Sequence, residues 1–228
     1  MNEESYPVSA GEETILRSAR GILEALPPGV MLVAAAKGRS VEQVRAAIRA
    51  GIRHVGHNYV RDAEAMISHV PEPVCWHMIG HVQTNKVRKV VELFDIVESV
   101  DSLRLAQEID RRLVSLGQVM PVLIEVNSGQ EQGKSGVTPQ ELDGLVRQVG
   151  SLSHLQVLGL RTMGPRFGDP EEARPFFRAT RLAFERLARA PLPHAEMRFL
   201  SMGMSNSYRV AIEEGANMVR IGTLLFGG

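Results

Sequence analysis

One lysine stands where it could carry out covalent chemistry. Lys37 comes directly after residues 31–36, which read Met-Leu-Val-Ala-Ala-Ala. Partial desolvation beside these small residues would favour the neutral amine, which is the form that attacks an aldehyde to make a Schiff base. A lysine at the end of a strand can equally lay its stem along apolar surface and keep its charge in water. The position alone therefore leaves both roles open.

Two short segments near the end of the sequence have the composition of a phosphate site. One reads Ser-Met-Gly-Met-Ser from Ser201 to Ser205, and the other reads Arg-Ile-Gly-Thr and ends in Gly222 and Thr223. Backbone N–H groups at the start of a short helix can point at an anion, and glycine allows the anion to approach. The two serines would add hydroxyl donors. The same glycines could serve only tight turns, and their spacing does not separate the two roles.

The elements that must position these residues recur along the whole chain. Eight short apolar runs, several nearly continuous in Val, Ile, Leu and Met, are typical of strands buried on both faces of a parallel sheet. The segments between them have helical period, most clearly over residues 40–51, 102–116, 139–149 and 171–190. The expected strands span residues 30–36, 52–56, 74–80, 94–97, 120–126, 155–160, 197–200 and 217–221.

This order predicts a (β/α)8 TIM barrel with parallel strands, in one domain over residues 1–228. An open doubly wound sheet fits less well, because open sheets with so many strands usually need more residues. An extra helix at about residues 10–26 precedes the first strand and is expected to cover the barrel where a long final helix is missing. For residues 40–51 we expect a capping box from Ser40 and Gln43. Thr138 before Pro139 is the expected start of a later helix.

In such a barrel, side chains at the carboxyl ends of the strands converge on one mouth. Gly133-Lys134-Ser135 resembles the end of a nucleotide-binding P-loop, but Ser128 stands where that pattern needs its first glycine. A second group, four histidines, lacks a compelling carboxylate or cysteine at ligand spacing, so no metal is expected. These histidines are His54, His57, His77 and His81. The side chains expected at the mouth are Lys37, Asn58, His77, Asn127, Met163, Ser201 and Arg220.

Composition excludes several classes of protein. The 228 residues include 26 basic and 26 acidic side chains, so the net charge is zero and nucleic acid is not an expected partner. The single cysteine, Cys75, allows no internal disulfide. The acidic start does not resemble a signal peptide, and no apolar run is long enough to cross a bilayer. A soluble cytoplasmic protein is expected. With 5% aromatic residues and no long apolar helix face left over, a monomer is expected.

Together the motifs resemble the pyridoxal phosphate homeostasis protein family, which is similar to the N-terminal barrel domain of alanine racemase. The matching stretches occur in the same order over nearly the whole chain. The stretch from Trp76 to Lys86 and the two C-terminal motifs are the specific ones. The stretches are residues 33–37, 56–60, 76–86, 134–136, 201–205 and 218–223.

The resemblance implies that Lys37 holds pyridoxal 5′-phosphate (PLP) as an internal aldimine. Arg220 would face the pyridine nitrogen and keep it unprotonated, because an arginine does not readily give up its proton. The ring would then be a weaker electron sink, which suits holding the cofactor. Phosphate binding would come from Ser201, Ser205, Gly222 and Thr223, and the ring or the strand ends around it would be lined by Asn58, His77 and Met163.

Four positions depart from the family pattern. The family commonly has glutamate at His57, threonine at Gly38, an aspartate where Asn206-Ser207 stands, and an apolar residue or methionine at Arg161. None of these changes removes the lysine, the phosphate donors or Arg220. We expect them to alter hydrogen bonding around the site, and with it cofactor affinity and release.

The resemblance favours a carrier that sequesters PLP and delivers it to apo-forms of PLP-dependent enzymes. The alternative is a racemase-like enzyme, which would need a second base that alanine racemase takes from a tyrosine in a separate domain. The tyrosines here are Tyr6, Tyr59 and Tyr208, and none lies in an appended domain, so no catalytic residue is assigned. A third hypothesis, an aldolase using Lys37, would need Glu125 to point inward, and strand alternation does not decide its direction.

Overall fold

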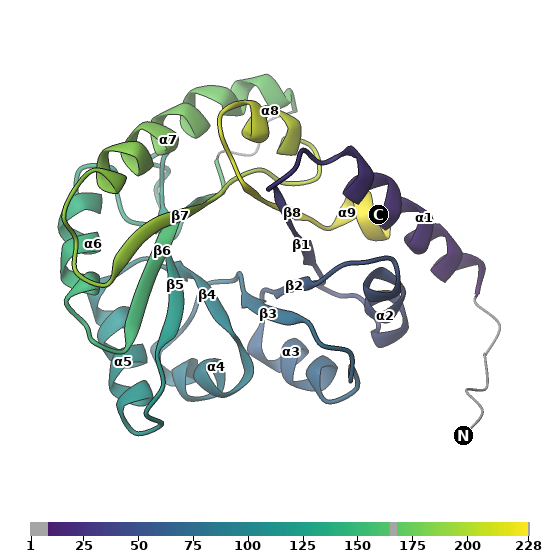
Figure 1. The fold of residues 1–228 in the computed structure, drawn as a ribbon, viewed down its shortest axis with the longest axis horizontal. Coiled ribbons are helices and arrows are strands. Elements are labelled where there is room, and N and C mark those ends of the chain that lie inside the picture. Colours follow the sequence, from purple (N-terminus) through teal and green to yellow (C-terminus); the bar gives the residue numbers. More distant parts are fainter. Residues whose placement is uncertain (1–8, 165–167, 228) are drawn as a thin grey trace.

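The computed structural model describes residues 9–164 and 168–227. In these residues, eight parallel strands close into a barrel in the order β1 to β8, with helices around the outside (Figure 1). The strands are β1 (Met31–Ala35), β2 (His54–His57), β3 (Cys75–Met78), β4 (Ile96–Val100), β5 (Met120–Val126), β6 (Leu155–Thr162), β7 (Ala195–Ser201) and β8 (Met218–Ile221).

Helices follow the strands, with two short 3-10 turns, η1 and η2, leading into α4 and α7. The last helix, α9, is a single short turn after β8. The helical elements are α1 (Ala10–Ala25), α2 (Val41–Arg49), α3 (Val60–Ile67), η1 (Thr84–Lys86), α4 (Val87–Leu93), α5 (Leu103–Val114), α6 (Leu142–Gly150), η2 (Pro170–Ala173), α7 (Arg174–Ala188), α8 (Tyr208–Glu213) and α9 (Thr223–Phe226).

Closure of the barrel comes from the pairing of its first and last strands. Met31 pairs with Met218 and Val33 with Arg220, both in parallel. Each remaining strand pairs in parallel with the next. All eight predicted strands are present, so the TIM barrel prediction is confirmed and the open sheet is excluded.

The helix predictions are confirmed in part. Ser40 and Gln43 form the expected capping box at the start of α2. The helix predicted from Pro139 begins three residues later, at Leu142, because residues 139–141 form a turn. Thr138 stabilises this turn through a 2.6 Å hydrogen bond from its hydroxyl to the Glu141 carboxylate, and not through a backbone cap.

Helix α1 takes the covering position expected of it. Its buried residues are Ile15, Ala19 and Ile22, and the helix lies beside α2 and α9 (Figure 1). A capping box between Ser9 and Glu12 begins the helix. The short α9 leaves apolar surface at this side of the barrel, and α1 covers it.

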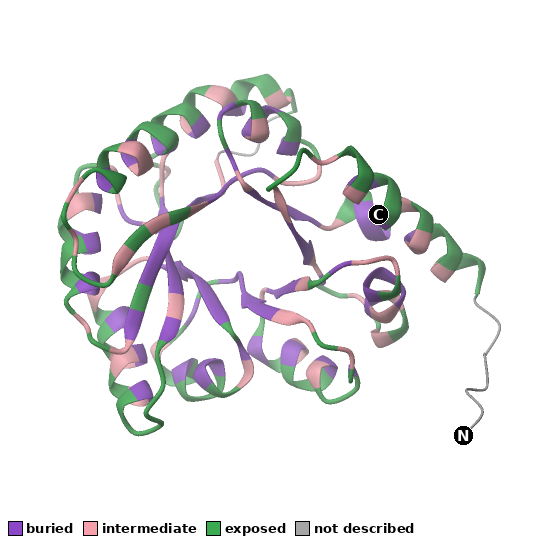
Figure 2. Cartoon of the chain, viewed as in Figure 1, coloured by how far each residue is buried: buried purple, intermediate pink, exposed green. Residues whose placement is uncertain are grey.

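The buried apolar residues form two groups on opposite faces of the sheet. A large outer core lies between the sheet and the inner faces of the helices, whose opposite faces are exposed (Figure 2). A smaller group fills the lower part of the barrel interior and includes Val33, Leu123 and Met218. Among the described residues, no helix combines the length and the apolar character needed to cross a bilayer.

Candidate functional site

A cavity of about 920 Å³ lies at the carboxyl ends of the strands. Its lining comes from the ends of several strands and from the loops that follow them, as the barrel topology dictates. Seven of the nine predicted site residues border it: Lys37, Asn58, Met163, Ser205, Arg220, Gly222 and Thr223. These positions, distant in the sequence, therefore meet at one mouth, and their binding of a cofactor stays a prediction.

Lys37 stands on the rim of this cavity. It follows Ala36, the last buried residue after β1, and its own side chain is exposed. Its Nζ lies 5.5 Å from the centroid of the Tyr59 ring. Of the two environments left open by the sequence, the structure shows the solvent-exposed one, because the chain turns at Gly38, which has a φ of 69°, and carries Lys37 out of the packed strand. The amine is therefore accessible to a ligand in the cavity.

Backbone donors converge at the opposite side of the cavity. The N–H groups of Gly222 and Leu224 both donate to Ser205 Oγ, at 3.2 Å each. A Cβ on Gly222 would lie 3.1 Å from the carbonyl oxygen of Ala35, so this strand end passes close to β1. Two N–H groups and a hydroxyl at one point can receive an anion.

The neighbouring Gly203 has a different role. Its φ is 88°, and a Cβ there would lie 2.7 Å from the Ala211 Cβ and 2.8 Å from the Tyr208 Cα. This glycine serves the tight turn that packs the loop against α8. The alternative explanation for the glycines is thus correct for Gly203, whereas Gly222 also presents its N–H at the cavity.

A buried polar network lies beneath the cavity, in the barrel interior. Glu98 on β4 accepts hydrogen bonds from His77 Nδ1 at 2.7 Å and from Ser201 Oγ at 2.8 Å. Arg220 donates to Ser201 Oγ at 2.5 Å and to the Thr162 carbonyl oxygen at 2.9 Å. The guanidinium also lies 3.9 Å from the Glu98 carboxylate. One carboxylate therefore links strands β3, β4, β7 and β8.

His77 and Ser201 belong to this network and do not border the cavity. Their expected place at the mouth is wrong, because both side chains are buried and bonded to Glu98. Sequence reasoning missed Glu98 altogether. The available signal was a carboxylate within the apolar strand β4, whose five residues are all buried.

Burial and pairing set the charges of the network. Burial favours neutral His77, but the hydrogen bonds that the protonated ring donates to Cys75 and Glu98 outweigh it and raise the pKa of His77 to about 9. Burial likewise opposes ionisation of Glu98. The positive charges of His77, Arg220 and Arg161 outweigh this effect and lower the pKa of Glu98 to about 2. Burial, with repulsion from Arg161, lowers the pKa of Arg220 to about 10. At neutral pH all three side chains are charged, and Arg220 presents a cation to the cavity.

Arg161 joins this cavity to a smaller neighbour of about 380 Å³. Its Nη1 lies 3.6 Å from Oε2 of Glu125, and both side chains are buried. The Nε and Nη1 atoms of Arg161 have no hydrogen-bond partner among the described residues. The direction of Glu125, which the sequence left open, is inward, and it borders the smaller cavity.

The motif around Lys134 lies in the loop after β5 and also borders the smaller cavity. Gly136 has a φ of 111°, and a Cβ there would lie 2.6 Å from the Asn127 nitrogen. Lys134 pairs with Glu131 in the same loop, at 2.5 Å. Close packing of this loop on the end of β5 gives the glycine a structural role.

The residues at the unusual positions do not all lie at the large cavity. His57 faces the helix layer, where its ring stacks on Trp76 at a centroid distance of 5.8 Å. Burial lowers the pKa of His57 to about 4, so this ring is neutral at pH 7. Ser207 accepts a 3.3 Å hydrogen bond from the Met204 N–H and so holds the loop that carries Ser205. Of the four unusual positions, Arg161 and Ser207 are the ones that border the large cavity.

Comparison with known proteins identifies the family. A family model described as alanine racemase, N-terminal domain, matches residues 16–228. The pyridoxal phosphate homeostasis protein of Aquifex aeolicus is 40% identical over 200 residues, which cover 86% of each chain. This chain belongs to the pyridoxal phosphate homeostasis protein family. The family member of Synechocystis is 36% identical over 211 residues, covering 90% of this chain and 94% of the relative.

Solved structures agree with this family assignment. PipY from Synechococcus elongatus superposes with a TM-score of 0.87 in a structure without PLP, at 34% identity, and with 0.86 in a structure with PLP bound. Both comparisons cover 93% of this chain and 100% of PipY. Alanine racemase of Clostridium difficile shares the fold, with a TM-score of 0.75 and 16% identity. This chain spans 56% of that racemase.

Proposed function

We propose that this protein binds PLP in the large cavity and takes part in intracellular PLP homeostasis. The observation that carries the proposal is the meeting of an accessible lysine amine, converging N–H donors and a buried arginine around one cavity. Relatives named for PLP homeostasis and a PipY structure with PLP bound support it. The whole chain would work as one PLP-binding barrel domain in the cytoplasm.

The residues present fit the chemical groups of this cofactor. The N–H groups of Gly222 and Leu224, with Thr223 and the Ser205 hydroxyl, would receive the phosphate. Lys37 would form the covalent link, an aldimine, since PLP supplies an aldehyde and an electron-withdrawing ring. Arg220 would face the pyridine nitrogen, held in place by the Thr162 carbonyl oxygen and Ser201.

Ser201 and His77 would then act indirectly. Ser201 accepts from Arg220 and donates to Glu98, so it orients the guanidinium under the cavity floor. His77 supplies a positive charge to Glu98 from the other side. We propose both as positioning residues for Arg220, in place of the direct contacts with the cofactor that the sequence suggested.

A carrier role is favoured over racemisation. Arg220 remains protonated and cannot readily supply a proton to the ring nitrogen, which weakens the ring as an electron sink. Tyr208 is buried, and its hydroxyl accepts a 3.1 Å hydrogen bond from Arg209. Tyr59 lies on the rim beside Lys37, and Tyr6 lies outside the described residues. We propose that the protein holds PLP as a monomer and releases it to apo-enzymes that need it.

The test is to load the purified protein with PLP, remove free cofactor by gel filtration and record the visible spectrum. We expect a yellow protein with PLP retained in a one-to-one ratio. Protein that takes up no PLP would refute the proposal. The loaded protein is then mixed with an apo-form PLP enzyme, which should gain activity, and separately with L-alanine. Rapid racemisation of L-alanine would contradict the carrier role and show that the protein is a racemase.

Arg220→Gln should change the bound cofactor and weaken its retention. The variant removes the cation expected at the ring nitrogen, so the absorption maximum should shift. Loss of a charge-assisted hydrogen bond worth about 1.5–3 kcal/mol should weaken PLP binding roughly tenfold or more. The measurement is a spectral titration with PLP, with thermal unfolding to verify the fold. Arg209→Gln is the matched control, because Arg209 is exposed and does not border the cavity. An unchanged spectrum and affinity in Arg220→Gln would contradict the role assigned to Arg220.

A further inference from the structure

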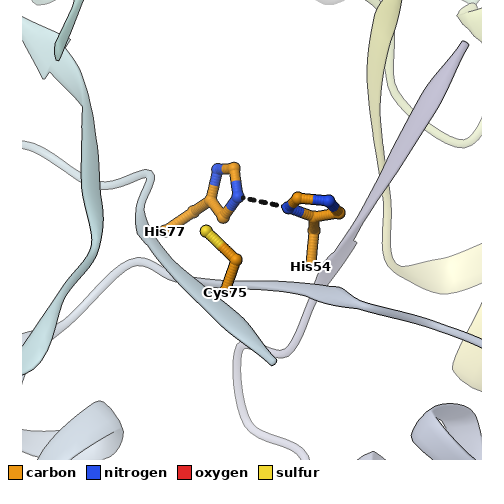
Figure 3. A group of neighbouring side chains, drawn as sticks. All are labelled: His54, Cys75 and His77. Atoms are coloured by element: carbon orange, nitrogen blue, oxygen red, sulfur yellow. Dashed lines mark hydrogen bonds between the residues drawn. The ribbon is translucent and has the colours of Figure 1, made fainter. Parts of the chain in front are cut away.

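We propose that His54, Cys75 and His77 form a binding site for a zinc-class divalent cation inside the barrel, next to the buried network to which His77 also belongs. The three side chains point toward one another from neighbouring strands β2 and β3 (Figure 3). Their ligand atoms all lie within 4.8 Å of one another. This cluster is separate from the cavity at the mouth, and the proposal does not depend on PLP binding.

Strand register explains why the three residues meet. His54 and Cys75 are direct partners across the parallel β2–β3 pair. Cys75 and His77 are two residues apart on one strand, so their side chains project from the same face of the sheet. That face is the barrel interior, where Cys75 packs beside the inner apolar group and His77 reaches Glu98.

The sequence alone pointed away from a metal, because it offered four histidines without a matching cysteine. The structure separates these histidines. His57 lies in the helix layer, and His81 lies near the mouth with its Nδ1 3.4 Å from Asp101. Only the tertiary structure brings His54 and His77 together with Cys75, 21 residues along the chain from His54.

The distances suit a small ion. His54 Nδ1 and His77 Nε2 are 3.0 Å apart. Bonds of about 2.0–2.1 Å to nitrogen and 2.3 Å to sulfur in a tetrahedral zinc site place ligand atoms roughly 3.3–3.7 Å apart. The two rings would therefore separate by a few tenths of an ångström, and the Cys75 side chain would turn toward them. Both changes are side-chain adjustments that leave the strand register intact.

Glu98 prepares His77 for this role. The carboxylate accepts the Nδ1 proton of His77 at 2.7 Å, and Nε2 is directed at His54. A bound cation would displace the Nε2 proton of the charged ring to solvent, while Nδ1 keeps its bond to Glu98. A histidine that donates one ring nitrogen to a carboxylate and offers the other to a metal is the common arrangement around protein-bound zinc. Ser201 and Arg220 hold the carboxylate in turn. The ligand is thus oriented before any ion arrives.

The ligand set selects the kind of ion. Two imidazoles and one thiolate favour zinc and its chemical relatives over magnesium or calcium, which prefer oxygen ligands. His54 and Cys75 are half-buried, and His54 borders a hollow of about 330 Å³ at the amino-terminal end of the strands. An ion can therefore reach the cluster from solvent. Three protein ligands leave a fourth position for water.

The test uses Co²⁺ as a visible probe on the full-length protein. Because Cys75 is the only cysteine, a thiolate-to-cobalt charge-transfer band can arise from this site alone. We expect one equivalent of Co²⁺ to give this band together with the visible spectrum of a tetrahedral site. One equivalent of Zn²⁺ should then abolish both signals. Absence of the charge-transfer band at saturating Co²⁺ would overturn the proposal.

Variants separate the site from surface binding. Cys75→Ser should lose the charge-transfer band, and His54→Gln should weaken Co²⁺ affinity at least tenfold. His69→Gln removes an exposed histidine elsewhere and is the matched control, with unchanged binding. Lys37→Ala should also bind Co²⁺ normally, which keeps this test independent of the cofactor. Thermal unfolding without metal verifies that each variant folds, and equal Co²⁺ affinity in His54→Gln and the unaltered protein would contradict the site.

Discussion

Replacing Glu98 by glutamine should lower the free energy of unfolding by about 3 kcal/mol near pH 6. The fully buried carboxylate lies against His77 and close to Arg220, two cations that have little access to water. Removing one member of a buried charge network typically costs about 3–5 kcal/mol, because the remaining charges are left unpaired. Glutamine keeps the size and some hydrogen bonds, which places the loss at the lower end. Urea unfolding followed by circular dichroism measures it.

The loss should depend on pH in a defined direction. The pKa of His77 is raised to about 9, so its contribution is complete below about 6.5 and is lost as pH rises through 9. The pKa of Glu98 is lowered to about 2, so its contribution is complete above about 4.5 and is lost as pH falls through 2. The difference between the unaltered protein and Glu98→Gln should therefore be largest between about pH 4.5 and 6.5.

The matched control is Glu64→Gln. Glu64 pairs with Lys89 at 2.6 Å, but both side chains are about half exposed, at 47% and 49%. Water screens such a pair, so we expect no measurable loss of stability. Two outcomes would show that the buried ion pair between Glu98 and His77 does not exist in solution. One is equal free energies of unfolding for Glu98→Gln and Glu64→Gln. The other is a loss of stability in Glu98→Gln that grows above pH 9.

Lys37→Ala should abolish covalent attachment of PLP. After loading and borohydride reduction, we expect one modified peptide in the unaltered protein, the one that carries Lys37, and none above background in the variant. Stability should change by less than about 0.5 kcal/mol, because the lysine side chain is exposed and packs little. The measurements are peptide mass mapping and urea unfolding. A folded variant that still carries reduced PLP would show that another residue forms the link.

Lys134→Ala is the control for this experiment. Lys134 is another lysine at the mouth, but it borders the smaller cavity and pairs with Glu131. Labelling of Lys37 should persist in this variant. The comparison therefore distinguishes a specific link in the large cavity from general reaction of PLP with exposed amines at the mouth.

The sequence by itself determined the barrel and most of the mouth. Eight apolar runs, several of them nearly continuous, predicted the eight strands, and residues at the carboxyl ends of parallel strands must meet where the sheet closes into a barrel. Lys37, Arg220 and Gly222 are consequently at the cavity, as predicted. The sequence predicted helix starts less accurately. Residues 139–141 form a turn, so α6 begins at Leu142 although Pro139 is a typical first helical residue.

Only the tertiary structure decided what lies beneath that mouth. Whether a strand residue points into the barrel or toward the helices, and which distant residue it then meets, depends on the register of every neighbouring strand, and a shift of one residue reverses its face. In the observed register, His77 on β3 points into the barrel toward Glu98 and Cys75, whereas His57 on the adjacent strand β2 points outward and stacks on Trp76. Contacts between side chains that lie far apart in the chain leave no periodic signal in the sequence, so the buried charge network and the His–Cys cluster emerged only from the fold.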